Sequence, residues 1–201
     1  MKGLKQELRR LRSQIYELFG NFNYSKPSRN DLDNKLAKYL NFRGGFFIEV
    51  GANDGYSESN TYYLERILGW QGVLVEGIPE LYERCRRQRR KAHVYNCALV
   101  EKDYAEPTVQ MHFAHLMSVV EGSRQDSEAE AKHISKGIRV YKLDESYIVK
   151  VPARTLESIL DELPHPLKID FFSLDVEGYE LNVLKGLNLE KYRPKYILNL
   201  V

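Results

Sequence analysis

Three acidic side chains near the C-terminus have types and spacing suited to chemistry. Asp175 ends segment 169–175, which has the composition of a buried strand, and Glu177 and Glu180 follow it. Asp175 could take a proton from a hydroxyl, hold the cationic end of a ligand, or bind a metal ion with Glu177. The alternative is that these acids interact with the N-terminal dipole of the next helix, which excludes none of these roles.

A further acid, Glu49, lies in a strand–turn sequence typical of nucleotide sites. Residues 46–50 predict a buried strand, and residues 57–68 predict a helix after the turn. The turn between them lacks the Gly-x-Gly-x-x-Gly spacing of dinucleotide enzymes. A carboxylate at Glu49 would repel a pyrophosphate but suits an ammonium group. An ordinary turn is the alternative. The turn residues expected to contact a ligand are Gly51, Ala52, Asn53, Asp54 and Gly55.

Glu76 ends a second short apolar strand, 73–76, which begins 18 residues after Gly55. An α/β nucleotide enzyme places at this position the acid that binds the ribose hydroxyls. A carboxylate there accepts two hydrogen bonds from a cis-diol, and its charge rejects a 2′-phosphate. The alternative is a strand-end acid that faces solvent.

Strand and helix patterns alternate from residue 46 to residue 198. This alternation predicts an α/β fold with a mostly parallel sheet and helices on both faces. Because ligands bind at the carboxyl ends of such strands, we expect Glu49, Glu76 and Asp175 at one edge. The remaining elements are predicted strands at 93–99 and 196–198, and predicted helices at 31–40, 79–90, 155–163 and 181–184.

Residues 101–151 predict an insertion that lies over the active face and shapes an acceptor pocket. Residues 108–113, 137–143 and 147–151 are interpreted as strands, and 123–136 as an exposed loop or short helix. His112, His115 and His133 could suggest a metal. However, strand positions three apart face opposite sides, so no metal site is predicted. His115 is kept as a candidate base.

Residues 1–28 are expected to form a basic amphipathic helix and a linker before a domain at 29–201. Apolar residues recur at steps of three and four. We interpret this segment as a helix that packs on its own domain or pairs in a homodimer, with a partner or a membrane surface as alternatives. The apolar positions are Leu4, Leu8, Leu11, Ile15, Leu18 and Phe19.

The bulk properties exclude several classes of protein. The chain has 201 residues, a net charge of +2 and 43% hydrophobic residues, which suits one globular domain. It shows neither a transmembrane run nor a secretory signal, and Cys85 and Cys97 lack metal-ligand spacing, so a cytoplasmic protein with reduced thiols is expected. The basic cluster 84–91 follows Glu80 and Glu83 without interleaved aromatic residues, which favours a solvated helix end over nucleic-acid binding.

Four motifs occur in the order seen in the FkbM family of S-adenosylmethionine (SAM)-dependent methyltransferases. They are residues 47–55, 69–76, 155–160 and 170–186. The resemblance implies a Rossmann-like class I methyltransferase fold, SAM as cofactor, and methylation of a hydroxyl on a sugar, glycan or natural product.

The resemblance also implies roles for individual residues. It places SAM on Glu49, Gly51, Asn53 and Glu76. It places Asp175 and Glu177 at the junction of methyl donor and acceptor, with Asp175 also near the cofactor. The segment after the third strand would lie near the adenine, with Asn96 at its edge and Cys97 or Ala98 against its flat face.

The sequence departs from the family after its fifth predicted strand. The family usually has an acid near the position of Asn199 and further strands after it, so the predicted sheet lacks the closing C-terminal hairpin. Two other functions stay open. One is an NAD-dependent oxidoreductase, which Glu76 would suit but Glu49 would not. The other is a non-catalytic module that binds SAM or a partner.

Overall fold

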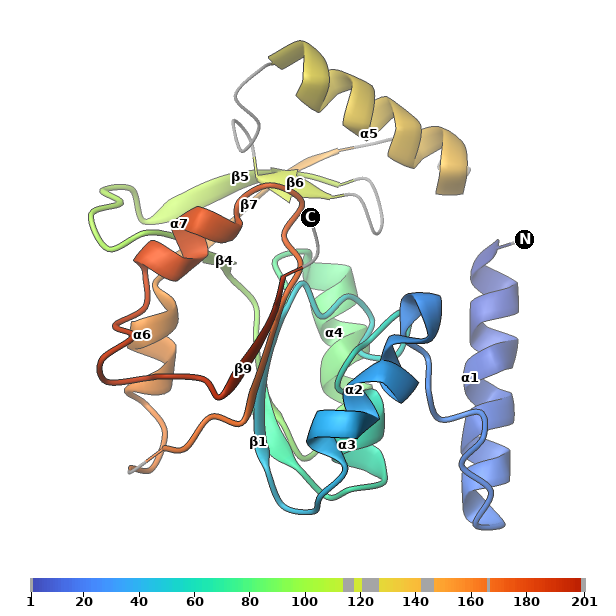
Figure 1. Cartoon of the computed structure of the whole chain (residues 1–201). Coiled ribbons are helices and arrows are strands. Elements are labelled where there is room, and N and C mark those ends of the chain that lie inside the picture. Colours follow the sequence, from blue (N-terminus) through green and yellow to red (C-terminus); the bar gives the residue numbers. More distant parts are fainter. Residues whose placement is uncertain (1, 114–117, 121–126, 142–146, 166, 200–201) are drawn as a thin grey trace.

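The centre of the molecule is a sheet of five parallel strands in the order β3-β2-β1-β8-β9 (Figure 1). The computed structural model describes residues 2–113, 118–120, 127–141, 147–165 and 167–199. The predicted mostly parallel α/β sheet is confirmed. Its strands are β1 (Phe46–Val50), β2 (Gln71–Val75), β3 (His93–Tyr95), β8 (Phe171–Leu174) and β9 (Tyr196–Asn199).

The register of the sheet brings the expected loops to one edge. Val50, the last residue of β1, pairs with Val75 of β2 and with Leu174 of β8. The loops that follow these three strands therefore leave the sheet side by side. Because β1 lies at the centre, the loop after it is enclosed by the loops on both sides.

Helices cover both faces of the sheet, as predicted. Successive strand residues face opposite sides. Phe47 packs in a core cluster with Leu64, while Ile48 packs in another with Ile159. The first face carries α2 (Leu32–Leu40), α3 (Tyr62–Arg66) and α4 (Pro79–Gln88), and the second carries α6 (Leu156–Leu160) and α7 (Glu180–Lys185).

A second sheet lies above the carboxyl edge of the first (Figure 1). Its strand order is β4-β7-β5-β6, with β5 and β7 antiparallel. The prediction of a strand at 137–143 is wrong, because residues 137–141 belong to the helix α5 (Ser127–Tyr141). The first residues of α5 are rich in Ala, Glu and Lys, which favour a helix. The strands are β4 (Ala98–Leu99), β5 (Thr108–His112), β6 (Val119–Val120) and β7 (Ile148–Arg154).

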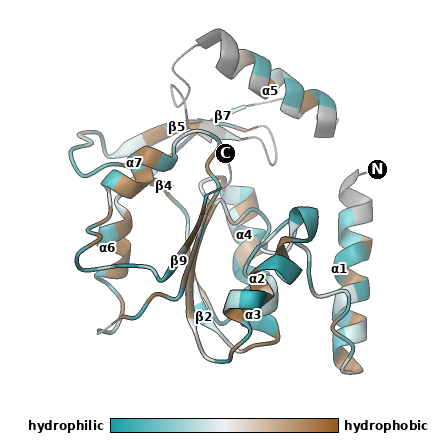
Figure 2. Cartoon of the chain, viewed as in Figure 1, coloured by the Kyte–Doolittle hydropathy of each residue, from teal (hydrophilic) through white to brown (hydrophobic). Residues whose placement is uncertain are grey.

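The N-terminal helix α1 (Lys2–Leu18) contacts the domain through polar side chains. Glu17 accepts hydrogen bonds from Ser13, Ser25 and Tyr62 and pairs with Arg66 at 2.8 Å. Several of its apolar side chains face solvent, and the C-terminal end of α1 is coloured hydrophobic in Figure 2. Among the described helices, none is long and apolar enough to cross a membrane. The exposed apolar residues include Leu8, Leu11, Ile15, Leu18 and Phe19.

The loop after β1 is fixed by a buried carboxylate. Glu49 accepts hydrogen bonds from the Ser59 hydroxyl (2.9 Å), the Asn60 N–H (2.7 Å) and the Thr61 hydroxyl (2.6 Å). The prediction of a helix over 57–68 is therefore wrong for its first five residues: the Asn60 N–H is bound to Glu49, and α3 begins at Tyr62.

Arg89 completes this buried network. Its guanidinium is 1% exposed and lies 3.6 Å from Glu49 and 2.6 Å from Glu65. It also donates to the Gly55 carbonyl at 3.1 Å. Arg89 thus joins the end of α4, α3 and the loop after β1.

We expect Glu49→Ala to lower the free energy of unfolding by about 3 kcal/mol, because it removes one of the two carboxylates that pair with the buried Arg89. Urea unfolding without any ligand measures this change. Glu190→Ala is the control, since Glu190 is exposed, and it should change stability by less than about 0.5 kcal/mol. If the two variants were equally stable, the structural role of Glu49 would be refuted.

Candidate functional site

An acidic cleft lies where the carboxyl ends of β1, β2 and β8 meet the second sheet. We name it the edge cleft. Its polar walls come from the loops after the three strands, and its apolar walls come from β4, β5, β6 and α7. The lining residues are Val50, Gly51, Asn53, Val75, Glu76, Gly77, Cys97, Ala98, Leu99, Met111, Ser118, Val120, Asp175, Val176, Glu177, Tyr179 and Val183.

Gly51 is required by close contact between two loops. Its φ is +84°, and a Cβ added to it would lie 2.1 Å from the carbonyl oxygen of Asp175. The N–H groups of Gly51 and Ala52 both donate to the carbonyl of Val75. The glycine therefore lets the loop after β1 lie against the loop after β8.

Other residues of this loop differ in their access to the cleft. Asn53 lines it, with φ at +50°. The carboxylate of Asp54 instead accepts from the N–H groups of Tyr56 and Ser57, and Gly55 packs against Arg89. Neither Asp54 nor Gly55 lines the cleft.

Glu49 does not line the cleft either. Its carboxylate points to the interior, where the Ser59, Asn60 and Thr61 donors and Arg89 surround it. The sequence pattern correctly predicted that this acid lies at the end of β1. In the structure its carboxylate holds the loop after β1.

Glu76 lies at the edge of the cleft in the predicted position after β2. Its two oxygens accept from the Asn53 N–H at 2.7 Å and the Ile78 N–H at 2.8 Å, so it joins two neighbouring loops. Burial raises the pKa of Glu76 to about 7, although both backbone hydrogen bonds act in the opposite direction. A further donor, such as a ligand hydroxyl, would favour the ionised form.

An apolar wall faces Glu76. Cys97 and Ala98 line it, whereas Asn96 donates to the carbonyls of Glu76 and Gly77 and supports the loop from behind. Burial raises the pKa of the Cys97 thiol to about 12, so it stays neutral. Both cysteines are free, as predicted.

The acids after β8 have separate roles. Glu180 accepts from the N–H groups of Val176 and Gly178, so it stabilises the turn that precedes α7. Asp175 and Glu177 line the cleft, and the Glu177 backbone is left-handed, with φ at +55°. Burial, followed by the charges of Glu177 and Glu180, raises the pKa of Asp175 to about 7.

The charge of the edge cleft selects its ligand. Among the lining residues that the structure describes, three are carboxylates (Glu76, Asp175 and Glu177) and none is lysine, arginine or histidine. Such a site attracts a cation and repels phosphates. Among the described residues, no group of three or more His, Cys, Asp or Glu side chains is arranged so that it could hold a metal ion. The candidate base His115 lies outside the described residues.

Sequence reasoning missed the residues that β5 and β6 of the second sheet contribute. Met111 and Val120 line the cleft, and a Cβ added to Gly77 would lie 2.3 Å from the Met111 sulfur. The alternation of inward and outward residues in the strand could have predicted that Met111 points inward. It could not have predicted which loop Met111 contacts. The cavity that remains measures about 90 Å³, below the roughly 300 Å³ of small ligand sites.

Comparisons with known proteins bear on the family. Two solved structures are similar over part of the chain. The first is a SAM-dependent methyltransferase from Thiobacillus denitrificans in complex with S-adenosyl-L-homocysteine, with 14% identity, a TM-score of 0.29, and coverage of 36% of this chain and 31% of that one. The second is YjhP from E. coli, with 16% identity, a TM-score of 0.28, and coverage of 39% and 36%.

The chain spans about a third of the length of these solved structures, and likenesses this weak establish neither fold nor function. No curated protein matches the chain. The profile of the Methyltransferase FkbM domain matches residues 49–199, a range that includes the end of β1, the edge cleft and β9. The chain therefore belongs to the FkbM methyltransferase family.

Proposed function

We propose that the protein is a SAM-dependent methyltransferase that transfers a methyl group to a hydroxyl oxygen. The observation that carries this proposal is the charge of the edge cleft, whose described lining contains three carboxylates and no cationic side chain. SAM carries a sulfonium and an ammonium group, which suit this lining. NAD carries a pyrophosphate, which the same carboxylates would repel, so the oxidoreductase alternative is disfavoured.

The residues present fit SAM part by part. Glu76 lies where a ribose diol can donate to a carboxylate that already accepts two backbone hydrogen bonds. Cys97 and Ala98 provide an uncharged wall for a flat base. Asp175 and Glu177 provide negative charge for the methionine end. Because the cavity of about 90 Å³ is small, binding of SAM requires Met111 and its strand to move away from Gly77.

Asp175 is the residue we propose to act on the acceptor. When bound, SAM supplies the electrophilic methyl group. A carboxylate with a pKa of about 7 is a better base for a hydroxyl proton than an ordinary aspartate. Burial and the charge of Glu177 keep this pKa high, and both side chains orient the hydroxyl. The acceptor class, a sugar, glycan or natural product, rests on the family resemblance.

Glu76→Gln should weaken SAM binding at least tenfold, because the neutral amide loses the charged acceptor for ribose hydroxyls. Isothermal titration calorimetry at pH 8 measures the affinity, and thermal unfolding of the free protein checks the fold. Glu106→Ala is the control, since Glu106 is exposed and outside the edge cleft. Saturable binding of NAD with higher affinity than SAM would refute the proposal.

Asp175→Asn should remove part of the pH dependence of stability. The folded pKa of Asp175, about 7, exceeds the unfolded value of about 3.9, so the native state holds its proton longer. Stability therefore falls as pH rises from about 4 to 7. Between pH 4 and pH 8 this group should cost the native protein roughly 4 kcal/mol in free energy of unfolding, and the variant should be spared this loss. Urea unfolding at both values tests this, with the exposed Asp103→Asn as control.

The same substitution should lower methyl transfer about 100-fold, because a general base is lost. The measurement is transfer of label from SAM to a panel of nucleotide sugars and lipopolysaccharides. The native kcat/KM should rise with pH through about 7, as Asp175 of the free enzyme ionises. Transfer at the full native rate by Asp175→Asn would remove this residue from the mechanism. SAM binding without any transfer would favour the non-catalytic module.

We further propose that α1 pairs with α1 of a second copy. The exposed residues Leu8, Leu11, Ile15 and Leu18 alternate at steps of three and four, as a and d positions of a coiled coil do. In a parallel pair this register sets Glu7, at a g position, opposite Arg12, at the e position five residues later, on the other copy. Opposite charges at these positions favour pairing.

Leu11→Lys should convert the dimer into a monomer, because it places a charge in the apolar seam. Analytical ultracentrifugation of the native protein and the variant measures this at about 50 µM. Leu181→Lys is the matched control, since Leu181 is also exposed but lies on α7. A monomeric native protein would refute the pairing, and binding of that monomer to anionic vesicles would favour a membrane surface instead.

A further inference from the structure

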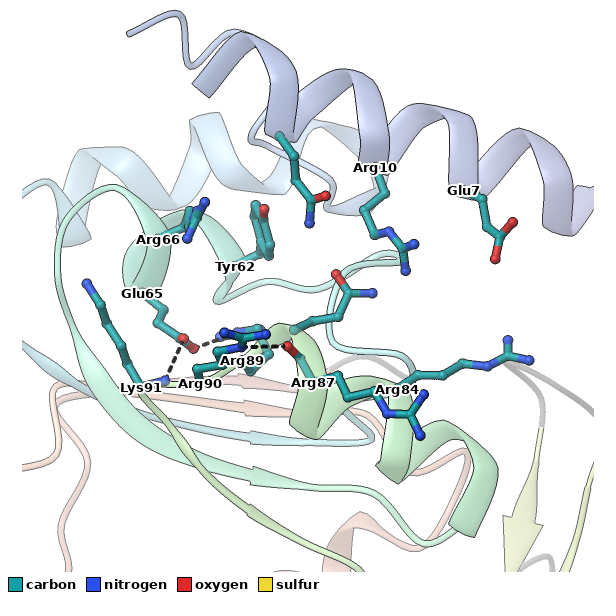
Figure 3. A pocket seen from close by; sticks show the side chains of 12 residues that line it. Glu7, Arg10, Tyr62, Glu65, Arg66, Arg84, Arg87, Arg89, Arg90 and Lys91 are labelled. Atoms are coloured by element: carbon teal, nitrogen blue, oxygen red, sulfur yellow. Dashed lines mark hydrogen bonds and ion pairs between the residues drawn. The ribbon is translucent and has the colours of Figure 1, made fainter. Parts of the chain in front are cut away.

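A large basic cleft lies between α1 and the C-terminal part of α4, on a different part of the molecule from the edge cleft (Figure 3). Its volume is about 770 Å³, which is within the range of small-molecule sites. It shares no lining residue with the edge cleft. The lining residues are Glu7, Arg10, Gln14, Tyr62, Glu65, Arg66, Arg84, Arg87, Gln88, Arg89, Arg90 and Lys91.

The cleft carries a large excess of positive charge. Seven of its lining side chains are cationic and two are acidic. Within the described part of the chain, ion pairs account for only part of this charge: Arg89 pairs with Glu65 at 2.6 Å, Arg66 with Glu17 at 2.8 Å, and Arg87 with Glu83 at 3.9 Å. Four cationic side chains and one acidic side chain of the lining remain after these pairs are set aside. The cationic ones are Arg10, Arg84, Arg90 and Lys91.

These charges converge from two elements that are distant in the sequence. Figure 3 shows Arg10 pointing from α1 toward α4, which carries Arg84 and Arg87. Repulsion between such groups would favour separation of the two helices. A helix C-terminus alone does not explain the arrangement, because Arg10 belongs to another helix. An anion between them would replace the repulsion with attraction.

Buried polar atoms in the same cleft have no partner. Within the described part of the chain, Arg10 Nε and both the nitrogen and the oxygen of the Gln88 amide are inaccessible and without a hydrogen-bond partner. A buried polar group without a partner is unfavourable. Arg10 Nε and the Gln88 nitrogen require an acceptor, whereas the Gln88 oxygen requires a donor.

We propose that this cleft binds a phosphorylated small molecule that also carries hydroxyl groups, such as a nucleoside diphosphate. After the Arg10 and Gln88 side chains turn toward the cleft, phosphate oxygens accept from Arg10 and from the Gln88 nitrogen, and a hydroxyl donates to the Gln88 oxygen. Arg84 and Arg87 neutralise further phosphate charge. The excess positive charge of the basic cleft repels SAM, and the carboxylates of the edge cleft repel phosphates. The two clefts therefore select ligands of opposite charge.

The test is calorimetric titration of the full chain at 150 mM NaCl with two probes, uridine diphosphate and inorganic pyrophosphate. Uridine diphosphate should bind with a micromolar dissociation constant, at least tenfold more tightly than pyrophosphate, because only the nucleotide supplies hydroxyl donors. Affinity should fall as NaCl is raised to 500 mM. Equal affinity for both probes would overturn the assignment of a hydroxyl-bearing ligand, and no binding of either at 1 mM would overturn the site.

Variants locate the binding. Arg10→Ala and Gln88→Leu should each weaken uridine diphosphate binding at least tenfold, and Arg10→Lys should restore part of the affinity that Arg10→Ala loses. Arg86→Ala is the matched control, because Arg86 lies on the same helix but outside the cleft. It should bind within twofold of the native protein. Thermal unfolding of each variant checks its fold.

Other outcomes would refute the proposal. If Arg86→Ala weakened binding as much as Arg10→Ala, the interaction would be a diffuse surface effect. If a single-stranded RNA 12-mer or vesicles of anionic phospholipid bound through Arg10 while uridine diphosphate did not, the cleft would serve a macromolecular surface. Asp175→Asn should bind uridine diphosphate normally, so failure of the methyltransferase proposal would leave this result unchanged.

Discussion

The buried pairing of Glu49 with Arg89 is the interaction on which the rest of the structure depends. Two charged groups are removed from water, which is favourable only when both are fully hydrogen-bonded. Glu49 meets this condition with donors from residues 59–61, and Arg89 meets it with Glu65 and the Gly55 carbonyl. The network therefore fixes the loop after β1 without any ligand, and a fixed loop lowers the entropic cost of forming a binding site.

The edge cleft is organised by the opposite principle, since its described lining contains carboxylates and no cationic side chain. Burial and the neighbouring carboxylates raise the pKa of Asp175 to about 7, which means that the native state resists its ionisation. The unfavourable ionisation of Asp175 lowers the free energy of unfolding above pH 7. A cationic ligand offsets the repulsion among the carboxylates, so part of its binding free energy comes from repulsion already present in the free protein. Perturbed carboxylates of this kind are typical of functional sites.

The sequence predicted the parallel sheet and the edge at which Glu76 and Asp175 lie, because strand ends and glycine turns are local signals. It could not predict that Glu49 faces inward, because this depends on Arg89, 40 residues away. The same interaction shortened the helix predicted at 57–68, since tertiary hydrogen bonds outweighed helix propensity. Likewise, the sequence of the basic cluster after Glu83 predicted a solvated helix end. These residues form the wall of a cleft only because α1 lies opposite them.

Helix α4 connects the two clefts physically. Its first turn is held by Glu76, which accepts from the Ile78 N–H, and its last residues lead into Arg89. Arg89 lines the basic cleft and at the same time holds the Gly55 carbonyl of the loop after β1. A phosphate near Arg89 would compete with Glu49 and Glu65 for its guanidinium. The two clefts therefore lie at opposite ends of one helix, and the pairing of Arg89 with Glu49 and Glu65 joins the wall of the basic cleft to the loop that borders the edge cleft.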